Sequence, residues 1–103
     1  MSKEDKMTRD EITNMPAGRE LDALVAEKVM GWYPNATWSP STDIASAWQV
    51  INILISLRKR PRLMFVAENE WKVYFDIGDA EAYGSIAPLA ICRAALLAMM
   101  DAE

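Results

Sequence analysis

The sequence contains no histidine and only one cysteine, Cys92. Without histidine, a Ser-His-Asp or Cys-His nucleophile and a histidine-containing metal site are excluded. A single cysteine cannot form an intramolecular disulfide, and Cys92 lies in an apolar run, where the residue packs as a small hydrophobic group. Because a free thiol of this kind suits a reducing compartment, we expect a cytoplasmic protein.

Glycine-rich loops and long apolar segments are missing as well. The glycines stand singly, so no phosphate-binding loop is present. The first ten residues lack the apolar core of a signal peptide, and the most apolar segment is too short to span a bilayer, which predicts neither export nor membrane insertion. A net charge of -4 disfavours nucleic acid and anionic membranes as partners. We therefore predict no catalytic residues, no cofactor and no metal, and a protein that is not an enzyme.

What the sequence does contain is enough apolar residues for one folded domain. Of the 103 residues, 51% are hydrophobic and 25% are charged, which is typical of a globular protein. The alternating charges at the start predict a flexible N-terminus over residues 1–7. Residues 8–103 are expected to form a single domain.

Four segments have the apolar periodicity or end signals of helices. Thr8 and Glu11 have the spacing of a capping box, which predicts a short helix ending before Pro16. An apolar stripe predicts an amphipathic helix over residues 17–31, stopped by Gly31. Ser41, Thr42 or Asp43 can cap a second long helix that runs to about residue 59, and a last helix is predicted over residues 87–100.

Strand formers occupy the region between the two long helices. Residues 63–67 and 71–77 are separated by a polar turn, which predicts an antiparallel hairpin. Because two strands alone are marginal, we expect either a third strand over residues 82–85 or continuation of the sheet across a dimer axis. Trp71, Val73 and Phe75 alternate with polar residues, as expected when helices cover one face of a sheet. The expected fold class is α+β: a small antiparallel sheet packed against helices as an α/β sandwich.

The two long helices are unusually apolar around their circumference. The last one has a single charge, Arg93, and no polar face, while the second long helix has only a narrow polar strip. A helix that is apolar all round must be covered on more than one side, by its own domain or by another subunit. We therefore expect self-association, in the form of a homodimer.

Five residues are candidates for binding a ligand or a partner: Trp38, Arg58, Arg60, Arg62 and Arg93. Trp38 lies in an aromatic-rich loop and can line a pocket or simply pack. The one basic cluster consists of Arg58, Lys59, Arg60 and Arg62. It can bind a phosphate or a single-stranded nucleic acid, or it can merely complement a helix end and keep a strand edge soluble. Arg93 is expected to reach the surface, to pair with a carboxylate such as Asp22, Glu20 or Asp101, or to bind an anion.

An acidic cluster follows the predicted hairpin. Asp76, Asp79 and Glu81 resemble a weak site for a hard cation, but they lack the spacing of a calcium loop. A solvated turn is the favoured interpretation.

Three segments together resemble a known family. They are residues 18–32 (GRELDALVAEKVMGW), 41–48 (STDIASAW) and 88–98 (PLAICRAALLA). In order and spacing they are similar to the phage ABA sandwich domain family, over about residues 8 to 102. The resemblance implies an α/β sandwich encoded by a phage or prophage of a Gram-positive host, with no established activity to transfer. Ser85, Ile86 and Ala87 depart from the more polar Asp-Thr-Ala expected before the last helix.

Two functions follow from these observations. The first is a non-catalytic structural or interaction module that self-associates, with a host or phage protein as a possible further partner. The alternative is a binding module that holds a small ligand, a nucleotide or a host protein through the Trp38 loop and the basic end of the second long helix.

Overall fold

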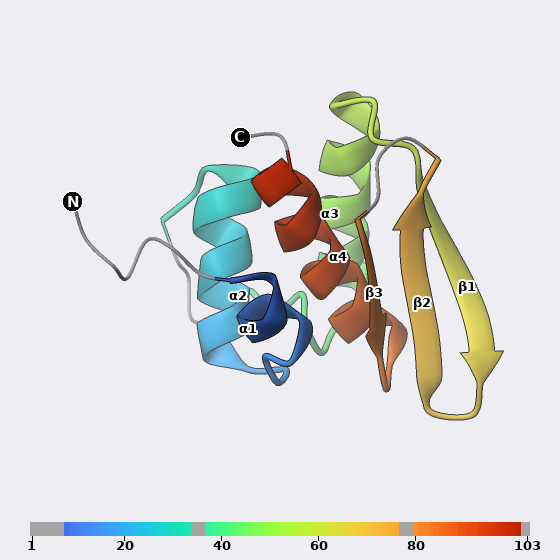
Figure 1. Ribbon diagram of the computed structural model, residues 1–103. Helices are drawn as coiled ribbons and strands as arrows, with labels where there is room; N and C mark the ends of the chain where they lie inside the picture. Colours follow the sequence, from blue (N-terminus) through green and yellow to red (C-terminus); the bar gives the residue numbers. More distant parts are fainter. Residues whose placement is uncertain (1–7, 34–36, 77–79, 102–103) are drawn as a thin grey trace.

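A computed structural model describes residues 8–33, 37–76 and 80–101. Within them the chain forms helices on one side of a sheet, which confirms the predicted α+β class (Figure 1). The elements, in chain order, are α1 (Arg9–Thr13), α2 (Arg19–Val25), the π-helical segment η2 (Ala26–Met30), α3 (Ile44–Ser56), β1 (Pro61–Ala67), β2 (Glu70–Phe75), β3 (Glu81–Gly84) and α4 (Ala87–Asp101). The predicted flexible segment 1–7 lies outside the described residues.

Side chains cap the first helix and α3 as the sequence predicts. At α1 the Glu11 N–H donates to Thr8 Oγ1 at 3.1 Å, and the Thr8 N–H donates to Glu11 Oε1 at 2.8 Å. At α3 the Ser46 N–H donates to Asp43 Oδ2 at 2.9 Å, so Asp43 is the cap. Each bond satisfies an N–H group that the first turn of a helix leaves without a partner.

The helix predicted over residues 17–31 has the expected end but a different second half. It begins at Arg19 as an α-helix and continues from Ala26 to Met30 as a π-helix. Gly31 then adopts the left-handed conformation, with φ of 74°, which glycine reaches at little cost. The apolar spacing predicted the stop at Gly31 but not the change of helix type.

The predicted end of α3 at residue 59 is wrong, because the helix ends at Ser56. Arg58 and Arg60 both have positive φ, at 62° and 56°, and the Lys59 N–H bonds back to the Leu54 carbonyl at 2.9 Å. The chain therefore unwinds over these residues before it enters β1 at Pro61. A run of basic residues is compatible with a helix, so nothing local in the sequence indicated this earlier end.

The sheet has three antiparallel strands in the order β1-β2-β3. The hairpin and the third strand are thus confirmed. Leu63 of β1 lies opposite Val73 of β2, which in turn lies opposite Ala82 of β3. Val73 and Ala82 are fully buried, so this face of the sheet packs on the helices. The opposite face includes Lys72 and Tyr74 of β2.

Helix α4 lies at the centre of the domain. Figure 1 shows it between α2 on one side and the sheet on the other, and it contacts α1, α2, η2, α3, β2 and β3. Its approach to β3 is close, since a Cβ added at Gly84 would lie 2.6 Å from the backbone nitrogen of Ala90. The apolar circumference of α4 is therefore covered by its own chain. The sequence left open whether its own domain or another subunit covers this helix, and α1, α2 and η2 supply the layer on the side away from the sheet.

Candidate interaction surface

One side of α3 presents large apolar side chains to solvent. Ile44, Trp48 and Ile55 are spaced by four and seven residues, which places them on one stripe of the helix. Each is about half exposed, at 50%, 51% and 56% of its surface. The side of α3 that packs in the core carries other residues, among them Val50 and Leu54. Only the narrow polar strip of this helix was expected to meet water, so its exposed apolar stripe is an additional feature.

Strand β1 is the second exposed apolar element. It lies at the edge of the sheet, and Leu63, Met64, Phe65 and Val66 are all exposed. Phe65 is the most open of them, with 60% of its surface exposed. Its ring meets the edge of the Trp71 ring with the centroids 5.3 Å apart. Natural sheets usually cover or charge such an edge, so an uncovered apolar one indicates a contact with another molecule.

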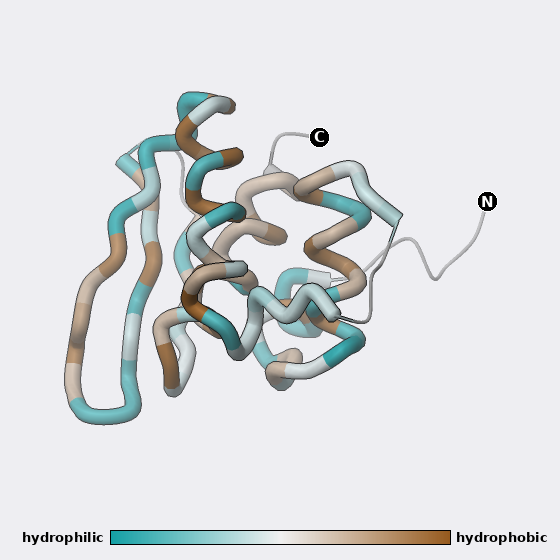
Figure 2. Tube along the Cα trace, turned by 180° about the vertical axis from the view of Figure 1, so that it is seen from behind, coloured by the Kyte–Doolittle hydropathy of each residue, from teal (hydrophilic) through white to brown (hydrophobic). Residues whose placement is uncertain are grey.

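These two elements lie at the same end of the domain. Helix α4 covers β2 and β3, whereas α3 lies beside α4 and has its main strand contact with β1. Leu63 faces the helix side of the sheet because its cross-strand neighbour Val73 does. Seen from behind, α3 and the β1-β2 hairpin stand next to each other, with apolar segments on both (Figure 2). We define the α3/β1 surface as Ile44, Trp48, Ile55, Leu63 and Phe65.

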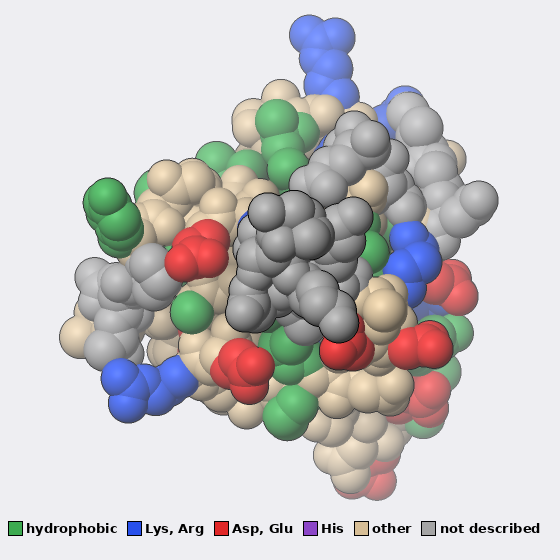
Figure 3. All heavy atoms as spheres, turned by 60° about the vertical axis from the view of Figure 1, so that its left-hand side comes forward, with side chains coloured by type: hydrophobic (Ala, Val, Ile, Leu, Met, Phe, Trp, Pro, Cys, Tyr) green, Lys and Arg blue, Asp and Glu red, His purple; other side chains and the backbone are tan. Residues whose placement is uncertain are grey.

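The side of the molecule that carries α1 and α2 differs from this surface. Figure 3 brings that side forward and shows acidic, basic and small apolar groups interspersed over the described part. This side of the molecule is therefore a mixed surface that carries charges of both signs.

The backbone of β1 also has an open edge. The Asp76 N–H donates to the Arg60 carbonyl at 3.4 Å, which makes residues 60, 62 and 64 the positions bonded to β2. Antiparallel pairs alternate, so the N–H and C=O groups of Leu63 and Phe65 point away from β2. No strand pairs with this edge among the described residues.

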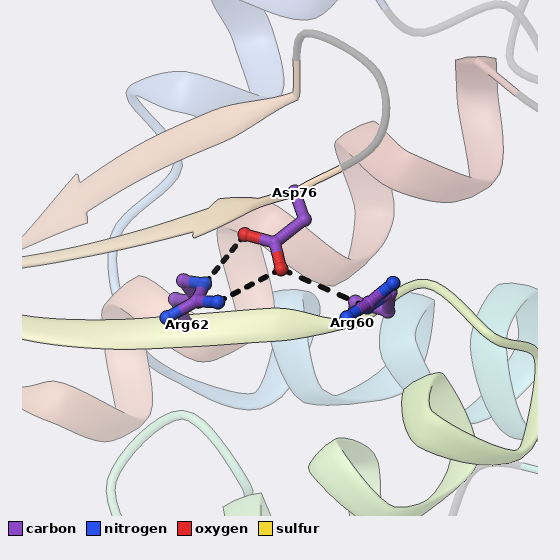
Figure 4. A network of polar contacts seen from close by, with 3 residues as sticks. All are labelled: Arg60, Arg62 and Asp76. Atoms are coloured by element: carbon purple, nitrogen blue, oxygen red, sulfur yellow. Dashed lines mark hydrogen bonds and ion pairs between the residues drawn. The ribbon is translucent and has the colours of Figure 1, made fainter.

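The basic cluster at the start of β1 is partly neutralised. Arg62 binds the Asp76 carboxylate through two nitrogens, with Nη2 2.9 Å from Oδ2, and Arg60 Nε lies 3.7 Å from the same oxygen (Figure 4). The hydrogen bond from Arg62, together with the charges of Arg62 and Arg60, lowers the pKa of Asp76. Three charges thus form one exposed network with a positive excess.

Trp38 does not belong to this basic site. Its Nε1–H donates to Gln49 Oε1 at 2.7 Å, and its ring packs edge-on against Trp32 at 4.9 Å. Gln49 lies in the first half of α3, whereas the arginines follow the end of that helix. From Gln49 to the end of α3 at Ser56 the helix rises about 10 Å, so the Trp38 indole N–H and the arginines lie apart. Partial burial against the core gives Trp38 a packing role.

Arg93 donates its described hydrogen bonds to backbone carbonyls. Its Nε donates to the Met15 carbonyl at 3.0 Å, and its Nη1 donates to the Tyr83 carbonyl at 2.7 Å. Burial lowers the pKa of its guanidinium group. The predicted pairing with Asp22 or Glu20 is wrong, because Arg93 reaches instead to the end of α1 and to β3. Asp101, the third carboxylate named for it, has no described side chain.

Asp22 has another role: its Oδ1 accepts the Ser41 N–H at 2.8 Å, and Ser41 Oγ accepts the Gly18 N–H at 3.0 Å. Both Asp22 and Ser41 are buried. These bonds join the start of α2 to the chain that leads into α3. The role was not predicted, because it depends on residues far apart in the sequence.

Cys92 is fully buried in α4. Burial, reinforced by the charge of Asp22, raises the pKa of its thiol. Nucleophilic chemistry needs the thiolate, which this environment disfavours.

The acidic cluster does not come together as a metal site in the part of the chain that the structure describes. Asp76 binds the two arginines, and Glu81 Oε1 lies 3.4 Å from Lys72 Nζ. Asp79 lies outside the described residues. Over residues 8–33, 37–76 and 80–101 no group of three or more potential ligands is placed to hold a metal ion. In the same ranges no helix combines the length and the apolar character needed to cross a membrane.

The architecture defines a small α+β domain with helices packed on one face of an antiparallel sheet. The model of the phage ABA sandwich domain family matches residues 23–96, and the chain belongs to this family. Among solved structures it is similar to a phage protein from Bacillus cereus ATCC 14579, with a TM-score of 0.65 and 24% identity. That similarity covers 81% of this chain and 92% of the other, and it supports the fold. No curated protein matches the sequence.

Proposed function

We propose that this phage-family protein is a non-catalytic structural or interaction module that works by self-association. The observation that carries the proposal is the α3/β1 surface, where half-exposed Trp48 and Ile55 lie next to an uncovered apolar strand. Removing apolar area from water yields roughly 25 cal/mol per Å². Covering these side chains with a second copy would therefore favour a dimer.

The groups that a catalytic site would use support the non-catalytic part of the proposal. Cys92 is buried and its thiol pKa is raised, while Asp76 and Glu81 each bind a cationic side chain. The sequence offers no histidine to act as a general base. The single free cysteine supports a location in the cytoplasm of the host cell.

The alternative, a ligand site shared by Trp38 and the basic cluster, is less well supported. The Trp38 indole N–H is used by Gln49, and Arg60 and Arg62 share the Asp76 carboxylate. Titration with nucleotides and oligonucleotides, followed by tryptophan fluorescence, would revive this alternative if the emission changed at micromolar ligand.

Sedimentation velocity at micromolar protein concentration tests the proposal. We expect a particle of twice the chain mass of 11.6 kDa. Phe65→Lys should shift it toward the monomer, because a charge would enter the apolar contact. Thr13→Lys, an equally charged change at an exposed position of α1, should leave the dimer intact. A monomer in the unmodified protein at all concentrations would refute self-association.

A further inference from the structure

We infer that two copies of this chain join through antiparallel pairing of their β1 strands, which extends the sheet continuously across the dimer. This inference rests on the proposed self-association and specifies its geometry. The first step is the free edge itself. The N–H and C=O groups of Leu63 and Phe65 point away from β2, and the side chains of both residues are exposed. A second strand placed there would satisfy these backbone groups.

The other edge of the sheet is not equivalent. On β3 the Tyr83 carbonyl already accepts a hydrogen bond from Arg93 at 2.7 Å. Strand β3 is also shorter than β1, with four residues against seven. Of the two edges, β1 is therefore the one suited to pairing with another strand.

The charge distribution along β1 indicates that the strand pairing with its open edge is a second copy of β1, and that this copy runs antiparallel. Arg58, Lys59 and Arg60 precede the strand, and Arg62 lies within it. Glu68 and Glu70 follow it at the hairpin turn and are exposed. Because Asp76 supplies one carboxylate to two arginines, the first end stays positive while the turn end is negative. The strand edge thus has opposite charges at its two ends.

A two-fold axis between the copies makes the opposite charges at the two ends of β1 complementary across the dimer. Antiparallel pairing sets the positive end of each strand beside the negative turn of the other, whereas parallel pairing would set like charges together. In a register centred on Met64, Leu63 lies opposite Phe65 of the partner subunit. Arg60 then lies opposite Glu68 of the partner subunit. Leu63 and Phe65, whose backbone groups point outward, thus meet each other in this register, as an antiparallel ladder requires.

The same arrangement brings the exposed stripe of α3 to the new interface. Helix α3 lies on the β1 side of α4, so the two copies of α3 would stand on the same face of the joined sheet, on either side of the β1 seam. Trp48 and Ile55 would then approach the apolar surface of the partner. One symmetric contact thus accounts for both exposed apolar elements.

Disulfide trapping tests the pairing. Met64 lies at the centre of the predicted register, where facing residues have Cα atoms about 4.5 Å apart, which is within the range of roughly 4.4 to 6.8 Å that a disulfide accepts. Tyr83→Cys is the matched control, because Tyr83 and Met64 are each 39% exposed and lie on opposite edges of the sheet. The native Cys92 is not substituted in either variant, since it is buried and cannot form the cross-link. Under mild oxidation, Met64→Cys should form a linked dimer about a hundredfold faster than Tyr83→Cys, because facing thiols react at a high effective concentration.

A second variant tests the backbone directly. Phe65→Pro removes an N–H that faces the open edge and leaves the bonds between β1 and β2 in place, so it should raise the dimer dissociation constant by at least about tenfold. A protein that sediments as a dimer yet shows no preferential trapping at Met64 would overturn the edge pairing and leave self-association standing. A monomer without trapping would overturn both, and would assign the α3/β1 surface to a different protein.

Discussion

Arg93 in α4 donates a hydrogen bond through Nη1 to the carbonyl oxygen of Tyr83 in β3, at 2.7 Å. Through Nε the same guanidinium binds the Met15 carbonyl at the end of α1, at 3.0 Å. One side chain thus joins three elements, and it also occupies a carbonyl at the edge of β3. This explains why a charge is tolerated in an otherwise apolar helix: Arg93 has planar donors that two carbonyls can share.

Replacing Arg93 should destabilise the fold. Arg93→Met keeps much of the apolar stem but leaves the partly buried Met15 carbonyl without its donor. A lost hydrogen bond to a charged group costs about 1.5 to 3 kcal/mol, so we expect a reduction of about 2 kcal/mol in the free energy of unfolding. Urea denaturation measures it. Lys28→Met, at an exposed position of η2, is the control and should change stability by less than about 0.5 kcal/mol. Equal stability of the two variants would contradict the role of Arg93.

Gly84 should not tolerate a side chain. A Cβ at this position would lie 2.6 Å from the Ala90 nitrogen and 3.0 Å from Leu89 Cβ. Because α4 is packed on several sides, it cannot move away freely, and overpacking costs about 1 to 3 kcal/mol. Gly84→Ala is thus expected to lower the thermal midpoint by several degrees, while Ser85→Ala at the exposed neighbouring position leaves it unchanged. An unchanged midpoint in Gly84→Ala would show that β3 and α4 are less closely packed than described.

The Asp22 carboxylate should matter as a hydrogen-bond acceptor rather than as a charge. It accepts the buried Ser41 N–H at 2.8 Å. Asp22→Ala leaves that N–H without a partner, at a cost of about 1 to 3 kcal/mol, whereas the side-chain oxygen of Asp22→Asn can still accept it. In chemical denaturation, the free energy of unfolding of Asp22→Asn should be closer to that of the original protein than the free energy of unfolding of Asp22→Ala is. A lower stability of Asp22→Asn than of Asp22→Ala would contradict this interpretation.

The network of Asp76 predicts a pH dependence of stability. Its hydrogen bond with Arg62 lowers the carboxyl pKa below the ordinary value of 3.8. The unfolded chain therefore binds a proton more readily than the folded one, so the contribution of Asp76 is fully present above the ordinary pKa and is lost as the pH falls through the lowered one. The stability difference between the original protein and Asp76→Asn should be constant from pH 7 to 5 and should shrink below pH 4.

Urea midpoints at pH 7, 5 and 3 measure this dependence. Glu27→Gln, which removes an exposed carboxylate on η2, is the control for the change in net charge. If the difference between the original protein and Asp76→Asn were the same at pH 3 and pH 7, the ion pair with Arg62 would not contribute to stability.

Much of the fold could be predicted from local signals. The hairpin, the last helix, a cap within residues 41–43 and a third strand depend on neighbouring residues. All are confirmed, with the cap at Asp43 and the strand at 81–84 rather than 82–85. The partners of Arg93 could not be predicted, because Met15 is distant in the sequence and offers a backbone group that any residue has. Which chain covers α4 could not be predicted either, since a helix that is apolar all round does not reveal whether its own chain or another one covers it.

The candidate surface was predicted only in part. The sequence attributed self-association to both long helices, whereas the exposed large apolar groups of the described residues lie mainly on α3 and β1. A signal was present: Leu63, Met64, Phe65 and Val66 are apolar without the polar alternation of β2. Such a run is usual in a strand buried on both faces, and only the sheet order shows that β1 is an edge.

Amide hydrogen exchange at Leu63 and Phe65, measured at high and at low protein concentration, tests the central claim most directly. Both N–H groups face the open edge of β1, while the Met64 N–H faces β2 and provides an internal reference. If β1 strands pair, Leu63 and Phe65 should be protected at high concentration and lose that protection on dilution, with Met64 protected longer. Fast exchange of Leu63 and Phe65 at every concentration would contradict pairing through this edge.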